Sequence, residues 1–199
     1  MALAASNAIS DMLISMKEKA VAAADKGLDT TSRTALAEDF NALRSQISTI
    51  VKNAEFNGSN LIDGGTTDIT AITNADATQT LTVKHQNLTL GGGNILITAT
   101  QSILTQATAS LAVSQLVSSL NNVNSSLTKL GAGATSLEQN RTFADRLSDV
   151  IETGIGNLVD ADLAKESANL QAQQVKEQRG NKALSIADQS PQTNLLLFQ

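Results

Sequence analysis

The sequence has no cysteine, tryptophan or tyrosine, and only one proline and four phenylalanines in 199 residues. Without cysteine it can form no disulfide, which fits a protein that works outside the cell without disulfides and fits many cytosolic proteins equally well. The single proline, Pro191, leaves long stretches free to be helical. Because alanine, leucine, isoleucine and valine dominate the hydrophobic residues, we expect slender helices that approach one another closely.

The formal net charge of −5 argues against a general nucleic-acid binder, which needs a basic face. No run of about 18 apolar residues is present, so no membrane insertion is expected. The start of the chain lacks the basic and hydrophobic regions of a conventional secretory signal, so any export is expected to follow another route. The single histidine, His85, is expected at the surface or facing a turn, and we expect no catalytic residue, metal site or cofactor.

Apolar residues recur every seven positions in the second half of the chain, a period that predicts one long α-helix with a buried stripe. The stripe consists of Leu116, Val123, Leu130, Leu137, Ala144, Ile151 and Leu158. Gly131 and Gly133 lie within it without changing its spacing. Each should weaken the helix by about 1 kcal/mol relative to alanine, so we interpret them as a bend or a close-contact site in a continuous helix.

Two shorter helical patterns come first, from about residue 2 to 25 and from about 30 to 54. Their predicted packing residues are Ile9, Leu13 and Met16 in the first, and Leu36, Phe40, Leu43, Ile47 and Ile50 in the second. Gly27 is the expected C-terminal cap of the first helix, and Thr30, Thr31 and Ser32 offer N-cap hydroxyls to the second. Because the connection is short, we predict an antiparallel pair.

The stretch EFNGSNLIDGG at 55–65 carries two turn dipeptides, Asn57-Gly58 and Asp63-Gly64. Its apolar residues, Phe56, Leu61 and Ile62, are expected to point inward.

From 66 to 100 the helical period disappears and threonine, isoleucine, leucine and valine dominate. Apolar and polar residues alternate at 81–83 and 88–90, and the pattern at 95–98 predicts a further short strand. With a turn at Gly91–Asn94, these predict a small antiparallel β-hairpin unit.

Together these patterns predict a mainly α protein: an elongated antiparallel helical rod of two shorter helices packed on one long heptad helix, with a small β-hairpin insert. We divide it into N-terminal rod helices with the turn (1–65), a variable β-rich insert (66–100), the long C-terminal rod helix (101–159) and a C-terminal tail helix (160–199). Within the tail, Gly180 is expected to interrupt the helix and Pro191 to stop it.

Four stretches carry distinctive motifs: MLISMKEKAVAAA at 12–24, EFNGSNLIDG at 55–64, LVDADLAKESANLQ at 158–171 and ALSIADQSPQTNLLLF at 183–198. In this order they resemble bacterial flagellins, particularly the short flagellins of alphaproteobacteria. The resemblance implies a non-enzymatic structural subunit of the flagellar filament. It also implies an extracellular protein that assembles with other flagellin subunits by rod packing and serves motility.

The resemblance further implies secretion through the flagellar type III export channel and an export chaperone that binds the tail. The expected tail contacts for assembly or for the chaperone are Leu184, Ile186, Leu195, Leu196, Leu197 and Phe198.

Two departures from the family pattern concern assembly. The family's long first segment is missing, and polar residues stand where similar flagellins have apolar or smaller ones, namely Arg179, Asn181, Lys182 and Asn194. We therefore expect a truncated flagellin that polymerises poorly. The alternatives are a hook–filament junction protein and a monomeric ligand of an export chaperone.

Overall fold

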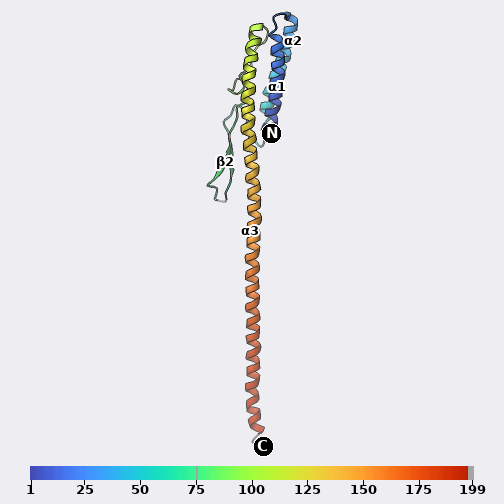
Figure 1. The fold of residues 1–199 in the computed structure, drawn as a ribbon. Coiled ribbons are helices and arrows are strands. Elements are labelled where there is room, and N and C mark those ends of the chain that lie inside the picture. The colour runs from blue at the N-terminus through green and yellow to red at the C-terminus, as the bar shows by residue number, and fades with distance from the viewer. Residues whose placement is uncertain (75, 197–199) are drawn as a thin grey trace. The chain divides into compact units, whose positions relative to one another are not determined.

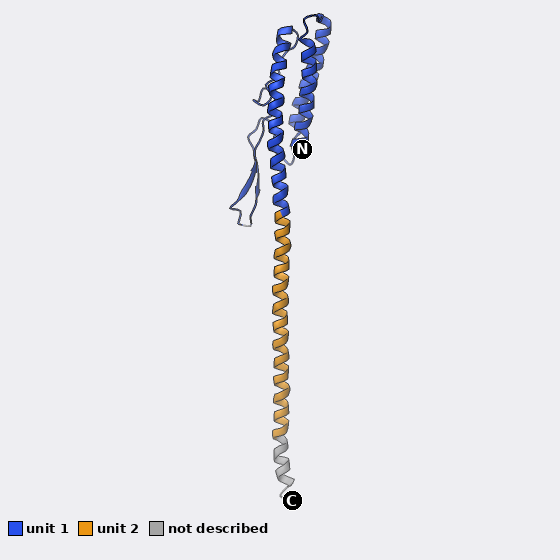
Figure 2. Ribbon diagram, viewed as in Figure 1, with its two compact units in different colours: residues 1–142 blue, residues 143–199 orange. Residues whose placement is uncertain are grey.

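The computed structural model describes residues 1–74 and 76–196, with side chains described as far as residue 187. In chain order the elements are α1 (Ala2–Ala23), α2 (Thr30–Asn53), β1 (Ile69–Ile72), β2 (Thr80–Val83) and α3 (Gln106–Leu196) (Figure 1). The mainly helical fold with a small antiparallel hairpin is as predicted. The chain divides into two compact units, residues 1–142 (unit 1) and 143–199 (unit 2) (Figure 2). Among the described residues, no helix has the length and hydrophobicity that a membrane span requires.

Unit 1 is built around one hydrophobic core to which α1, α2 and the first part of α3 all contribute. α1 packs along α2, and each presents apolar residues at helical spacing. Its largest fully buried helical side chains are Ile9, Leu13, Met16, Phe40, Ile47, Leu116 and Val123. Helical periodicity in three separate stretches therefore converges on a single core.

The C-terminal cap of α1 and the N-cap of α2 both differ from those predicted. The N-cap of α2 is Asp29, whose carboxylate accepts from the Ser32 backbone N–H at 2.9 Å and from the Ser32 hydroxyl at 2.7 Å. These hydrogen bonds hold the pKa of Asp29 below its ordinary value. Gly27 is not in the left-handed region and does not cap α1. The reason is Arg33, a buried side chain that donates to the carbonyls of Ala23, Asp25 and Leu28 and so satisfies the end of α1.

The turn at Asn57-Gly58 is confirmed, because these two residues adopt φ values of 51° and 77°. The flanking residues Phe56 and Ser59 exchange backbone hydrogen bonds of 2.9 and 3.0 Å. Ile62 is buried as expected, but Phe56 is 72% exposed, so its predicted inward position is wrong. A hairpin this tight projects the residue before it away from the chain on either side.

The insert holds one antiparallel hairpin, in which β1 pairs with β2 from Ile69 opposite Val83 to Ile72 opposite Thr80. The strands predicted at 88–90 and 95–98 do not form, although Gly91 and Gly93 make a turn between them with positive φ. Their backbone groups have other partners: the Leu88 N–H donates to Ile62 O at 2.9 Å, and the Leu96 N–H donates to the Ser119 hydroxyl at 2.9 Å. Within the segment only an isolated bridge between Leu90 and Ile95 forms, with the Gly91 N–H donating to the Ile95 carbonyl at 2.9 Å.

α3 is one continuous helix from Gln106 to Leu196, so the predicted interruption at Gly180 and stop at Pro191 are both wrong. A glycine costs a helix about 1 kcal/mol but leaves every hydrogen bond possible. A proline removes one backbone donor and kinks a helix without always ending it. α3 runs without a change in secondary structure across the boundary predicted between 159 and 160, which stays a prediction, and the two compact units divide after Thr142.

Candidate functional site

The heptad stripe of α3 is buried only in its first part. Leu116, Val123 and Leu130 are buried, and Leu137 is half-buried against the same core. The predicted packing residues of α2 that lie at the core's edge, Leu36, Leu43 and Ile50, are likewise half-buried against it. The predicted packing residues that belong to unit 1 therefore lie in or against one hydrophobic core.

The stripe is exposed beyond that point. Ile151 is 52% and Leu158 is 73% exposed, so burying them within one chain, as the heptad pattern predicted, is wrong for the described residues. The physical reason is length. α1 and α2 have 22 and 24 residues, and at about 1.5 Å per residue each extends only about 35 Å. Helices of that length match only part of a stripe that runs from Leu116 to Leu158.

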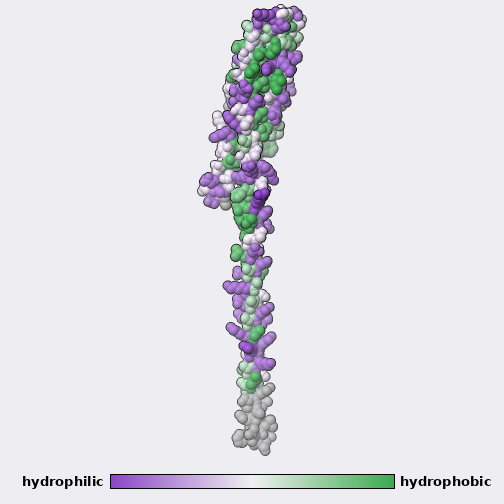
Figure 3. Space-filling view, viewed as in Figure 1, coloured by the Kyte–Doolittle hydropathy of each residue, from purple (hydrophilic) through white to green (hydrophobic). Residues whose placement is uncertain are grey.

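Unit 2 therefore carries a long set of exposed apolar side chains on α3, each 43–73% exposed. We name this set the apolar face, although at 3.6 residues per turn its members spread over more than half of the helix circumference; it consists of Phe143, Leu147, Val150, Ile151, Ile155, Leu158, Val159, Leu163, Leu170, Val175, Leu184 and Ile186. Hydrophobic residues are visible along this length of the helix between hydrophilic ones (Figure 3). Soluble proteins seldom leave so many large apolar residues in contact with water, and such surfaces mark contacts with partners.

The apolar face includes two of the predicted tail contacts, Leu184 and Ile186. The side chains of Leu195 and Leu196 are not described, and Leu197 and Phe198 lie outside the described residues.

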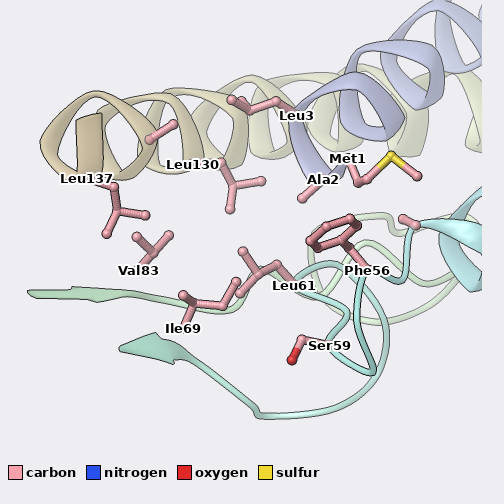
Figure 4. Close-up of a pocket in the computed structure, with 12 residues that line it drawn as sticks. Met1, Ala2, Leu3, Phe56, Ser59, Leu61, Ile69, Val83, Leu130 and Leu137 are labelled. Atoms are coloured by element: carbon pink, nitrogen blue, oxygen red, sulfur yellow. The ribbon is translucent and has the colours of Figure 1, made fainter. Parts of the chain in front are cut away.

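A second apolar surface lies in unit 1, where a pocket of about 340 Å³ opens at the start of α1. Residues from four parts of the unit line it: Met1 and Leu3 at the start of α1, Phe56 and Leu61 of the turn, Ile69 and Val83 of the hairpin, and Leu130 and Leu137 of α3 (Figure 4). Almost every side chain that lines it is hydrophobic. It suits an apolar side chain and offers little to a polar substrate.

The hairpin rests directly on α3 at a glycine. A Cβ on Gly133 would lie 2.7 Å from Val83 Cγ1, closer than van der Waals contact allows. The close-contact interpretation of this glycine is therefore confirmed, whereas Gly131 has no atom within 4 Å of its Cβ position. Asn122 of α3 also donates to the Asn94 carbonyl at 3.2 Å.

Of the two positions expected for His85, at the surface or facing a turn, the structure excludes the first, because its side chain is only 9% exposed. Its Nε2 lies 3.2 Å from Asp63 Oδ1, and its backbone N–H donates to Asp68 Oδ1 at 2.9 Å. Lys84 pairs with Asp68 at 2.6 Å and, together with the His85 N–H, holds the pKa of Asp68 below its ordinary value. These contacts tie the hairpin to the preceding loop, and the described residues contain no cluster of side chains able to hold a metal ion.

Two arginines have structural roles that the sequence patterns did not reveal. Arg33 caps α1, and Arg44 of α2 donates to the carbonyl of Gln101 just before α3. Burial lowers the pKa of Arg44 from its ordinary value. A charged residue within a helical pattern normally indicates a solvated face, so the pattern carries no signal for either role.

Comparison with known proteins finds family matches to both the N-terminal and the C-terminal part of the chain. Residues 1–67 match the model of the bacterial flagellin N-terminal helical region, and residues 113–198 match that of the C-terminal helical region. Flagellin FljJ of Caulobacter vibrioides is 46% identical over 196 residues, covering 98% of this chain and 71% of the relative. The chain belongs to the bacterial flagellin family. It is a structural subunit of the extracellular flagellar filament, assembles with other flagellin subunits and is not an enzyme.

Other flagellins support the assignment. A flagellin of Brucella melitensis is 34% identical over 211 residues, covering 100% of this chain and 73% of the relative. The crystal structure of Bacillus cereus flagellin superposes with a TM-score of 0.61 at 23% identity, covering 69% of this chain and 78% of that one. This last likeness concerns the fold alone. The resemblance drawn from the four sequence motifs is confirmed.

Proposed function

We propose that this flagellin joins the filament through the apolar face of α3, and that residues 143–187 are buried by neighbouring subunits during assembly. The observation that carries the proposal is the exposure of that face. Twelve large apolar side chains between Phe143 and Ile186 are exposed in the single chain. Removing such a surface from water stabilises an assembly by about 25 cal/mol for each Å² of apolar area buried.

We further propose that the subunit leaves the cell through the flagellar type III export channel, as the family membership implies. An export chaperone would bind the same face beforehand. An amphipathic helix laid in an apolar groove is a common mode of recognition, and Leu184 and Ile186 are the described tail residues that would occupy it. A chaperone so placed would prevent the apolar face from associating prematurely.

Seeded growth tests the assembly proposal. Fluorescently labelled protein is added to sheared filaments of Caulobacter vibrioides, and the fraction that sediments with them is measured. We expect weak but measurable incorporation of the natural chain, in line with the poor polymerisation expected from its sequence, and loss of that incorporation in the Ile151→Glu/Leu158→Glu variant. The matched control is Ser167→Glu/Gln174→Glu, which adds the same charge at exposed polar positions of the same helix.

Failure of the natural chain to incorporate, or equal incorporation of all three proteins, would contradict the proposal. The chaperone proposal is tested by size-exclusion chromatography with a purified flagellin export chaperone. A one-to-one complex is expected that weakens when Leu184 and Ile186 are both changed to glutamate. A complex unaffected by this change would place the chaperone elsewhere.

A further inference from the structure

The turn after α2 carries the one Asn-Gly dipeptide of the sequence, Asn57-Gly58. Both residues are exposed and both lie in the left-handed region, with φ values of 51° and 77°. Asparagine is among the thermolabile residues of proteins. When glycine follows it, a five-membered ring closes readily between the carbon of the side-chain amide and the next backbone nitrogen, because glycine has no Cβ to hinder the approach.

The Asn57 side chain is unrestrained in the folded chain. Within the part of the chain that the structure describes, it makes no hydrogen bond. Asn60, three residues further on, is held in place instead. Its side-chain amide donates to the Val51 carbonyl at 2.7 Å, and its Oδ1 accepts from the Ile62 N–H at 2.9 Å. Of the two asparagines in this turn, only Asn57 is therefore free to rotate toward the following nitrogen.

The second turn dipeptide, Asp63-Gly64, is restrained in the same way as Asn60. Asp63 Oδ1 accepts from the Gly65 N–H at 2.8 Å and lies 3.2 Å from His85 Nε2. An ionised carboxylate is also a poor electrophile. The local sequence would rank both dipeptides as reactive, whereas the contacts in the structure leave only Asn57-Gly58 free to react.

We propose that Asn57 is a site of spontaneous deamidation, which slowly converts this position to aspartate and isoaspartate without an enzyme. The Gly58 nitrogen loses its proton and attacks Asn57 Cγ, so that a C–N bond forms and the side-chain nitrogen leaves as ammonia with that proton. Water then adds to one of the two carbonyls of the cyclic imide and breaks one of its C–N bonds. The net reaction exchanges an amide and water for a carboxylate and ammonium, and nothing is oxidised or reduced.

The isoaspartate product alters the turn itself. Its backbone passes through the former side chain and gains one carbon atom, so positions 57 and 58 no longer hold the pair of φ values that closes the turn. The backbone hydrogen bonds that Phe56 and Ser59 exchange should then open. Both residues line the apolar pocket at the start of α1 (Figure 4). Deamidation would therefore reshape one edge of that pocket and add a negative charge beside it.

This modification goes beyond the filament role. It depends on time and pH and takes place within a single chain, so it is measured without any filament and is independent of the seeded assay.

Peptide mapping by mass spectrometry tests the site. The full chain is kept in mildly alkaline buffer, with a synthetic peptide of residues 53–61 as the unfolded reference, and both are sampled over time. We expect position 57 of the chain to gain the mass difference between a hydroxyl and an amino group, as a mixture of aspartate and isoaspartate. The rate should rise with pH, because the attacking nitrogen must lose its proton. Asn60 and Asn124, an exposed helical asparagine that precedes a serine, should stay unchanged.

An intact Asn57 in the folded chain, at the time when the peptide has reacted completely, would overturn the proposal. Earlier conversion of Asn60 or Asn124 would also overturn it. Conversion of Asn57 to aspartate alone would count against it as well, because only the cyclic intermediate yields isoaspartate.

Two variants provide the second arm. Asn57→Gly removes the reactive amide and keeps a residue that accepts a left-handed φ, while Asn124→Ala is the matched loss of an exposed asparagine elsewhere. After ageing, an isoaspartyl methyltransferase assay should lose most of its signal in Asn57→Gly and keep it in Asn124→Ala, with unit 1 folded in both as judged by thermal unfolding. An undiminished signal from Asn57→Gly would contradict the assignment.

The effect on the turn is measured on the isoaspartate fraction of the aged chain, separated by ion exchange. The amides of Phe56 and Ser59 should exchange with deuterium several-fold faster in this fraction than in fresh protein. Equal exchange in the two would contradict the proposed opening of the turn.

Discussion

The Cγ1 of Val83 in β2 lies only 2.7 Å from the place that a Cβ on Gly133 in α3 would occupy, and its Cγ2 lies 2.9 Å from it. The hairpin and the long helix of unit 1 therefore meet without an intervening side chain. A β-branched residue at the end of a strand has little freedom to move aside, so the absence of a side chain on Gly133 sets how closely the insert approaches the helix.

Replacing Gly133 should reverse the usual effect of glycine in a helix. Alanine favours a helix by about 1 kcal/mol over glycine, but here its methyl group overlaps Val83, and overpacking of this kind costs about 1–3 kcal/mol. We expect Gly133→Ala to lower the free energy of unfolding. Gly131→Ala, at a site with no atom within 4 Å, should raise it by about 1 kcal/mol.

Urea denaturation of the two variants measures the difference. Equal stabilisation by both alanines would show that the hairpin does not rest on the helix as described. Adding Val83→Ala to Gly133→Ala should recover much of the loss.

Arg33 should stabilise unit 1 as the cap of α1. Its guanidinium donates to three carbonyls, and Arg33→Met would leave them without that donor at a cost of about 1–3 kcal/mol. Lys26→Met removes one positive charge from an exposed position of the same turn and should change stability little. Indistinguishable unfolding midpoints for these variants would contradict the capping role.

Low pH should remove the stabilisation of the folded state that ionised Asp68 provides. Its pKa is lowered by Lys84 and by the His85 N–H, so its ionised form stabilises the folded state above its unfolded pKa of about 3.9. That contribution is lost as the pH falls through the lower, folded value. Asp68→Asn should therefore lower the melting temperature between pH 5 and pH 7, and the difference from the natural chain should shrink below about pH 4. Asp76→Asn is the matched change in the same insert, and a difference that persisted at pH 2 would count against this account.

Substitutions along the α3 stripe should destabilise the free chain only where the stripe is buried in the core of unit 1. Leu116→Ala opens a cavity in unit 1 and should cost about 2–5 kcal/mol, because Leu116 is fully buried. Leu158→Ala should cost less than about 0.5 kcal/mol in dilute protein, where its side chain contacts mostly water. Comparable losses from both changes would mean that the free chain already buries the stripe beyond Leu137.

Local patterns were sufficient to predict the first two helices, the Asn57-Gly58 turn and strand β2, but not the continuation of α3 through Gly180 and Pro191. Each of these depends on periodicity or on the φ preference of a few neighbouring residues. The family followed from four ordered motifs. The features that were missed depend on contacts between distant residues: Arg33 with the end of α1, Ser119 with the Leu96 N–H, and His85 with Asp63. A local sequence pattern does not indicate which distant residue a side chain will contact.

The error about Ile151 and Leu158 has a different origin. A heptad repeat indicates that a face is buried but not in which molecule its partner lies. In a subunit of a polymer, part of the repeat is satisfied within the chain and part by its neighbours. The repeat runs unbroken across Leu137, so the pattern alone does not separate the part buried within the chain from the part left for neighbouring subunits.

Hydrogen–deuterium exchange of the labelled subunit, free in dilute solution and after incorporation into filaments, tests the central claim most directly. We predict that amides of the unit 1 core exchange slowly in both states. Amides of residues 143–187 should exchange fast in the free subunit and become protected in the filament. Residues 143–187 that remain fast in the filament, or that are already as protected in the dilute monomer as the unit 1 core, would contradict the assignment of the apolar face to subunit assembly.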